Sequence, residues 1–270
     1  MTFTLAVPFA ATKRGMAELD YAASLARQLG HDPKVAVQLR VLASGEPISP
    51  AMVQHLGAGA RFEAYKRTVA SVRGRFGEAD DLLIKIDGPD DAPLASHPEP
   101  GMFLVNGSNR VAVPETQPLI LTKGESAFEA RGPSKVLVPL GASDSGLRAL
   151  RQTLPLIAAL GCPIVLYHTT WKNPDIISSD PFDHVCVAAA ETILQAQQLI
   201  QETIARAQIE TVIECADGVV EGIRRAAIRM GCNLIVVARG SRAGFGSYAE
   251  MLARESPVPV LCYGRAEVMP

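Results

Sequence analysis

Lys135-Val-Leu-Val-Pro139 is a short apolar run of the kind that forms a buried parallel strand. Its last residues, Val138-Pro139, recur at Val7-Pro8, and a Leu-Gly pair recurs at the same offset, at Leu160-Gly161 and Leu29-Gly30. Further pairs recur in the same order: Asp87-Gly88 with Asp217-Gly218, Gly107-Ser108 with Gly246-Ser247, and Pro118-Leu-Ile-Leu121 with Pro257-Val-Pro-Val-Leu261. One half-chain unit therefore occurs twice, which predicts two copies of one small α/β domain.

The second half of the chain alternates apolar runs with helical patterns. Strands are expected at 135–139, 163–168, 210–214, 233–237 and 258–262, with amphipathic helices between them. Pro155 predicts a kink or short break in the first of these helices, and Asp217 is expected to cap the third. This alternation predicts right-handed crossovers and a doubly wound, five-stranded parallel sheet.

The first half has the same order of elements in a leaner form. Strands are expected at 3–7, 34–42, 82–86, 102–105 and 119–121, with helices at 14–29 and near 60–73. The stretch 87–100 holds four prolines, so the third helix is interpreted as a loop. We therefore expect a degenerate first domain at 1–124 and a second domain at 134–264.

Composition excludes several classes of protein. The net charge is −2 and the isoelectric point is near 6.2, with no basic run for nucleic acid or membrane surfaces. No apolar stretch approaches about 20 residues, and no signal-type leader precedes the first strand, so a cytoplasmic protein is expected. The five cysteines form no C-x-x-C pair, and the five histidines show no ligand spacing, so neither disulfides nor a metal site is expected.

The second half resembles the universal stress protein family in its tandem form. The resemblance rests on Val138-Pro-Leu-Gly-Ala-Ser143, on Gly246-Ser-Tyr-Ala-Glu250 and on Pro257-Val-Pro-Val-Leu261, with support from Leu166-Tyr-His168 and Ala216-Asp-Gly218. It covers 134–264 well and 2–124 weakly. The resemblance implies tandem five-stranded units of the adenine-nucleotide alpha-hydrolase-like fold. It also implies that the fifth strands of the two units pair inside one chain, and it leaves further homodimerisation open.

ATP-binding members of that family carry an acidic residue after the first strand and a loop of the form Gly-x-x-Gly, nine residues, Gly-Ser/Thr. Here the acidic positions hold Gly141 and Ala10, the first loop glycine aligns with Ala238, and the loop before Gly246 is several residues shorter. Glycine backbone N–H groups and a helix N-terminus can still bind an anion. The candidate nucleotide- or anion-binding residues are Arg239, Gly240, Ser241, Gly244, Gly246 and Ser247.

Several of these residues also have roles that need no ligand. Ser247 with Glu250 forms a capping box, and Arg239 with Arg242 can be a solvated surface pair. His168 has no acidic partner by sequence, and no Gly-x-Ser-x-Gly elbow is present, which argues against a hydrolase. The leading hypothesis is a non-catalytic stress protein that acts by binding or association, without cofactor and with reduced or lost ATP binding. The alternative is a nucleotide- or anion-binding protein that uses the second unit only.

Overall fold

The structure is a computed structural model that describes residues 2–9, 12–31, 35–42, 58–77, 82–87, 102–106, 119–121, 132–141, 144–171, 180–238 and 247–263. The chain forms two compact units, Met1–Gly132 and Pro133–Pro270. The predicted domain limits of 1–124 and 134–264 stay a prediction. The predicted loop at 87–100 lies almost wholly outside the described residues.

Unit 1 contains five parallel strands in the order β3-β2-β1-β4-β5. Their bounds are β1 (Thr2–Pro8), β2 (Ala36–Leu42), β3 (Leu83–Asp87), β4 (Met102–Asn106) and β5 (Leu119–Leu121). All five lie within two residues of their predicted positions. Inward side chains of β1 such as Phe3, Leu5 and Val7 are fully buried, as expected for a central strand covered on both faces.

Unit 2 repeats this order, with β10-β9-β6-β7-β8 all parallel within the unit. Its strands are β6 (Val136–Pro139), β7 (Ile164–Trp171), β8 (Ile209–Ala216), β9 (Leu234–Ala238) and β10 (Val260–Tyr263). Numbered within each unit, both sheets have the order 3-2-1-4-5. The predicted order of parallel strands is therefore confirmed in both units. Helices on both faces of the sheet are described in unit 2, where the doubly wound fold is confirmed.

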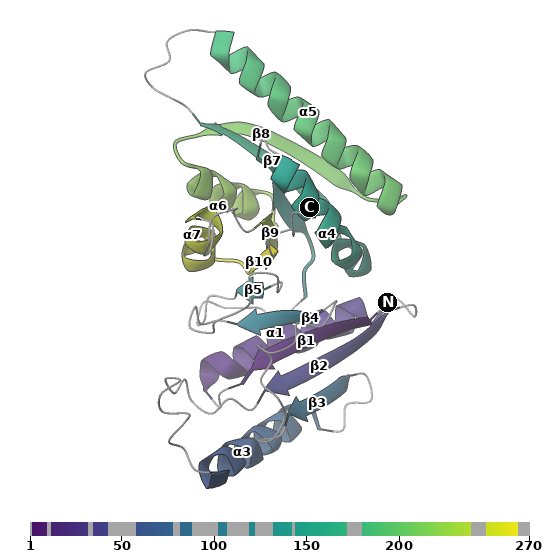
Figure 1. Cartoon of the computed structure of the whole chain (residues 1–270), viewed down its shortest axis with the longest axis vertical. Coiled ribbons are helices and arrows are strands. Elements are labelled where there is room, and N and C mark those ends of the chain that lie inside the picture. Colours follow the sequence, from purple (N-terminus) through teal and green to yellow (C-terminus); the bar gives the residue numbers. More distant parts are fainter. Residues whose placement is uncertain are drawn as a thin grey trace, which may run out of the picture. The chain divides into compact units, whose positions relative to one another are not determined.

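Helices cover both faces of the unit 2 sheet (Figure 1). α4 (Asp144–Leu160) packs on β6, β9 and β10, while α5 (Asp180–Thr203) packs on β7 and β8. α6 (Val219–Arg229) and α7 (Ser247–Glu255) contact each other, α6 packs on β7 and β8, and α7 packs on β10. The strands β7 and β8 lie on one side of the central strand β6, and β9 and β10 lie on the other side. Right-handed crossovers in these two directions place the helices on opposite faces of the sheet.

The predicted apolar stripes form the core of unit 2. Leu150, Leu154 and Ile157 of α4 are buried, as are Ala189 and Ile193 of α5. Two helix predictions need correction.

The first correction concerns Pro155: α4 continues through it, so the predicted short break is absent, while the predicted kink stays a prediction. A proline removes one helical hydrogen bond, and the buried face of the helix can offset that loss. The second concerns Asp217, which is not the cap of α6. Gly218 occupies that position with an extended backbone (φ −159°) and makes no side-chain cap bond.

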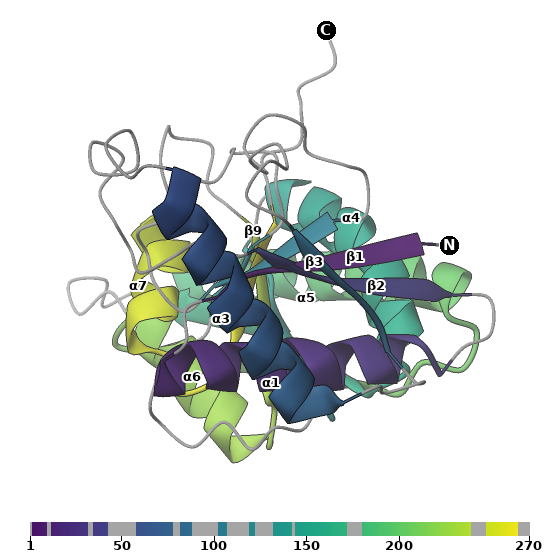
Figure 2. The same cartoon turned by 90° about the horizontal axis from the view of Figure 1, so that it is seen from below.

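Two helices of unit 1 are joined by an ion pair. α1 (Lys13–Leu29) begins at Thr12, whose hydroxyl accepts a hydrogen bond from the Gly15 N–H at 3.1 Å. α3 (Ala58–Phe76) contacts α1 through a bidentate bond from Arg75 to Asp20, with both N···O distances 2.9 Å. Figure 2 shows α3 (dark blue) as one continuous helix near α1 and the strands of its unit.

Candidate functional site

The candidate site of unit 2 is the carboxyl edge of the sheet between β6 and β9. The chain leaves β6 toward one face and leaves β9 toward the other, so the edge between these strands is a topological switch point. Ligands of open α/β sheets bind in the crevice at such a point. The described residues at this edge are Leu140 and Gly141 after β6, and Ala238 at the end of β9.

The end of β6 presents backbone rather than a charged group. The Leu140 N–H donates to the Tyr167 carbonyl at 2.8 Å, and the Leu140 side chain is buried. Gly141, at the position where the resemblance implies an acidic residue, is exposed. Gly146, in the first turns of α4, lies close to Gly141. A β carbon on Gly146 would be 3.5 Å from the Gly141 nitrogen. No carboxylate therefore follows β6 at this position.

Tyr167 and His168 lie in the middle of β7, which continues to Trp171 instead of ending at 168 as predicted. Their side chains point to opposite faces of the sheet, as neighbours in a strand must. His168 is 4% exposed, and its Nδ1 has no hydrogen-bond partner within the described part of the chain. Burial lowers the pKa of the imidazole, while a hydrogen bond with the Leu140 backbone opposes this shift. No carboxylate among the described residues bonds to the ring, so the geometry offers no acid–histidine pair for hydrolysis.

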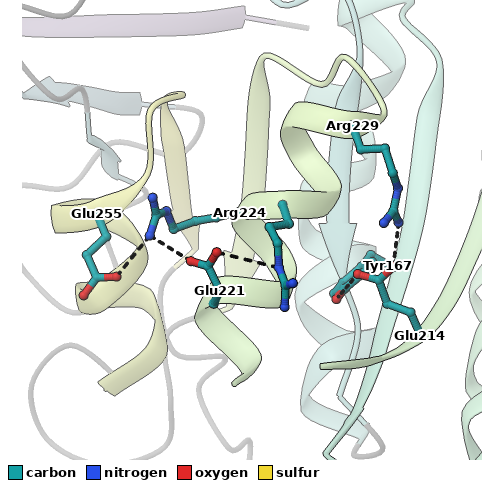
Figure 3. A network of polar contacts seen from close by, with 7 residues as sticks. Tyr167, Glu214, Glu221, Arg224, Arg229 and Glu255 are labelled. Carbon is teal, nitrogen blue, oxygen red and sulfur yellow. Dashed lines mark hydrogen bonds and ion pairs between the residues drawn. The ribbon is translucent and has the colours of Figure 1, made fainter. Parts of the chain in front are cut away.

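Tyr167 belongs to a polar network between the sheet and α6 (Figure 3). Its hydroxyl donates to Glu214 Oε1 of β8 at 3.0 Å, and Arg229 of α6 donates to Glu214 Oε2 at 2.6 Å. Burial raises the pKa of the Tyr167 phenol to about 12, so the hydroxyl stays protonated as a donor. Gly222 makes room for it, because a β carbon there would lie 2.5 Å from the Tyr167 oxygen.

A second group of charges in Figure 3 joins α6 to α7. Arg224 Nη1 lies 2.9 Å from Glu221 Oε2 on its own helix and 3.6 Å from Glu255 Oε2 at the end of α7. Glu221 also lies 3.6 Å from Arg225. These contacts hold α7 against α6, and α7 is the helix that begins directly after the candidate loop.

Most of the predicted site residues lie outside the described part of the chain. These are Arg239, Gly240, Ser241, Gly244 and Gly246; the capping contact between the Ser247 and Glu250 side chains lies outside it as well. Ser247 is placed as the first residue of α7. Because β9 ends at Ala238, only residues 239–246 separate the strand from this helix. The assignment of these residues to a site stays a prediction.

Sequence reasoning does not identify the pairing of Tyr167 with Glu214 and Arg229, nor the role of Gly222. The sequence pattern places Glu214 in a strand and gives no reason to single out Arg229. The signal that could reveal the contact is a glycine inside a strongly amphipathic helix, since such a glycine needs a packing reason. Two-residue strand periodicity would then select Tyr167 as the side chain facing α6.

The same described residues contain neither a cluster of metal ligands nor a membrane-spanning helix. No group of three or more His, Cys, Asp or Glu side chains gathers there in a way that could hold a metal ion. None of the helices described is both long and apolar enough to cross a bilayer. Burial raises the pKa of the Cys162 and Cys232 thiols to about 11, which makes them poor nucleophiles near neutral pH.

The strand order and the placement of the helices define a doubly wound α/β fold in unit 2, and unit 1 has the same order of parallel strands. The second unit is a universal stress protein domain: the model of the universal stress protein family matches residues 133–264. The family resemblance of the sequence is thereby confirmed for this unit. None of the curated proteins compared matches the chain.

Solved structures show the same likeness. A universal stress protein family member from Burkholderia pseudomallei is 25% identical over 49% of this chain and 96% of its own, with a TM-score of 0.42. One from Archaeoglobus fulgidus, described in complex with dAMP, is 22% identical over 47% of this chain and 95% of its own, at 0.39. Another from A. fulgidus DSM 4304 is 14% identical over 98% of this chain and 97% of its own, at 0.55. That last likeness spans both units and shows the fold alone.

Proposed function

We propose that this chain is a cytoplasmic stress-response protein that acts by binding and association, without catalysis and with reduced or lost ATP binding. The observation that carries the proposal is the end of β6, where the buried Leu140 is followed by an exposed Gly141 at the position of the acidic residue. Without a carboxylate there, a nucleoside loses a charge-assisted hydrogen-bond partner. The short connection between Ala238 and Ser247 supports the same conclusion, because fewer backbone N–H groups can surround a triphosphate.

The alternative function is nucleotide or anion binding by the second unit alone. It is favoured by the position of α7, whose first residue Ser247 follows the glycine-containing segment at the switch point. A helix N-terminus there would face a phosphate group. Because the family that the second unit resembles includes ATP-binding members, an adenine nucleotide is the first ligand to test. Arg239, Gly240, Ser241, Gly244 and Gly246 would then contribute to the site together with Ser247.

The nucleotide content of freshly purified protein separates the two functions. The protein is denatured and its supernatant is analysed for ATP, ADP and AMP by mass spectrometry, followed by calorimetric titration with ATP and magnesium. We expect no nucleotide and no binding heat. Nucleotide at a ratio near one per chain would instead establish the alternative. Gly246→Val should then abolish stabilisation by the nucleotide while the fold is retained, and release of phosphate from ATP would contradict a non-catalytic role.

A further inference from the structure

α3 and α5 occupy the same place in the two units, yet they carry opposite charge. Each helix connects the second strand of its unit to the third. α3 contains five basic residues and one acidic residue, which gives a formal charge of five minus one, or +4. α5 contains four acidic residues and no lysine or arginine, which gives −4 with histidine neutral. The net charge of the chain, −2, does not reveal this difference, because the charges of the two helices cancel.

The outer face of α3 carries basic side chains around two small residues, Ala70 and Gly74. Lys66, Ala70 and Arg73 lie four and seven residues apart on one side of the helix and are exposed, next to the exposed pair Arg67 and Gly74. Among the described residues, Arg67 and Arg73 have no ion-pair or hydrogen-bond partner. A β carbon on Gly74 would meet nothing within 4 Å. Two guanidinium groups therefore flank a strip of small residues that a second helix could approach closely.

The outer face of α5 is acidic and carries two exposed apolar side chains. Val187 and Leu194, seven residues apart, are each 56% exposed. Glu191 and Glu202 are exposed on the same side of the helix, opposite the buried stripe that contains Ile193. Neither carboxylate has a bonded partner among the described residues. The outer face of α5 therefore offers negative charge, complementary to the basic face of α3, together with two apolar side chains.

We propose that α3 of one copy of this chain packs against α5 of a second copy. Arg67 and Arg73 would pair with Glu191 and Glu202, while Leu194 would lie over the strip of small residues. Contacts between two α3 helices or two α5 helices are disfavoured by like-charge repulsion. Nucleic acid fits less well, because duplex affinity rises with the number of phosphates that are neutralised, and this face has only two unpaired guanidinium groups among the described residues. The inference rests on the association role proposed above and names its partner.

The test is sedimentation of the full chain at several concentrations and two salt concentrations. Wild-type protein should self-associate at low salt, and salt should weaken the association. A double variant, Arg67→Glu with Arg73→Glu, should weaken it about tenfold or more, and so should Glu191→Arg with Glu202→Arg. A chain that carries all four changes should recover association, because the two faces again have opposite charge. An equal mixture of the two double variants should also associate through their unchanged faces.

The matched control is Arg148→Glu with Arg151→Glu, two exposed arginines on α4 that change the net charge by the same amount. This variant should associate like the wild type. A wild-type chain that stays monomeric at every concentration would overturn the inference and leave the nucleotide result untouched. The inference would also be overturned if the control variant lost association to the same extent, or if the chain with all four substitutions did not recover association. Binding of a duplex DNA oligonucleotide through Arg67 and Arg73 without self-association would assign the face to nucleic acid.

Discussion

Units 1 and 2 share one strand order but differ in how their helices contact the rest of the unit. In unit 2, Gly222 lets α6 approach the sheet so closely that a β carbon would lie 2.8 Å from that of Ala216. In unit 1, the helix glycine Gly74 faces open space. In both units a buried apolar residue follows the carboxyl end of the central first strand. This residue is Phe9 in unit 1 and Leu140 in unit 2. The comparison teaches that buried strands keep the topology, while helix contacts and surface charge are free to diverge.

The polar contacts differ in the same way. In unit 2 the Tyr167–Glu214–Arg229 network extends from a buried strand to the surface of α6. In unit 1 the Arg75–Asp20 pair between α1 and α3 lies near the surface, where the arginine side chain is 53% exposed. Exposed pairs of this kind contribute little to stability. We therefore expect substitutions in the unit 2 network to have the larger effect.

Gly222→Ala should give the largest effect. The added methyl group would clash with the Tyr167 hydroxyl and with Ala216, so overpacking should lower the free energy of unfolding of unit 2 by about 2–3 kcal/mol. Because a chain of two units need not unfold in one step, the measurement is hydrogen exchange by mass spectrometry, with peptides of each unit followed separately. Unchanged protection of α6 and β7 would show that the helix does not contact the strand this closely.

Tyr167→Phe should cost less, because it removes one hydrogen bond and leaves Glu214 paired with Arg229. We expect a loss of about 1–2 kcal/mol in unit 2. Tyr248→Phe is the matched control, since Tyr248 is exposed and has no partner among the described residues. Its effect should stay within about 0.5 kcal/mol. Equal effects of the two substitutions would show that the network does not stabilise unit 2.

The pH dependence of unit 2 should reflect His168. Its native pKa lies below the ordinary value of 6.5, so the unfolded chain binds more protons in this range. Stability is therefore fully present above pH 6.5 and falls as the pH drops from there through the native pKa, by no more than about 1.4 kcal/mol per pH unit. Hydrogen exchange of unit 2 peptides at several pH values, corrected for the intrinsic exchange rate at each pH, measures the slope. His168→Phe should flatten it, whereas His31→Gln, at an exposed position, should leave it unchanged.

Gly74→Ala should have the smallest effect and the opposite sign. Alanine has a higher helix propensity, and nothing within 4 Å opposes its β carbon, so unit 1 should gain about 0.5–1 kcal/mol. Slower hydrogen exchange in α3 would confirm this gain, with unit 2 unchanged. A destabilised α3 would mean that another part of the protein lies close to Gly74. Gly74 would then resemble Gly222, where there is no room for a side chain.

The fold could be predicted from the sequence because buried parallel strands leave a strong local pattern. The apolar runs near 136–139 and 234–238 place two central strands directly, and the repeated Leu-Gly pairs mark where helices end. Gly161 shows why this works: its left-handed backbone (φ 63°) favours glycine at the end of α4. The prediction for Asp217 is wrong because an acidic residue beside a glycine gives the same local signal whichever of the two is the cap.

The candidate site could be predicted only in part. The loss of the acidic group at Gly141 is a matter of residue identity, so the sequence shows it directly. The contact of Tyr167 with Glu214 joins residues 47 positions apart, and no local pattern links them. The surface inversion between α3 and α5 becomes meaningful only when the strand order shows that the two helices are equivalent. Long-range contacts and equivalence between units therefore required the structure.

The opposite charges of α3 and α5 have a consequence for the geometry of assembly. The proposed contact joins two different surfaces, α3 of one chain and α5 of the next. Two chains joined by one such contact leave one α3 and one α5 free, unless a second contact pairs these helices within the same dimer. An assembly of this kind either closes into a ring or grows from both ends. Under the proposed contact, the size of the assembly would then depend on protein concentration and on ionic strength.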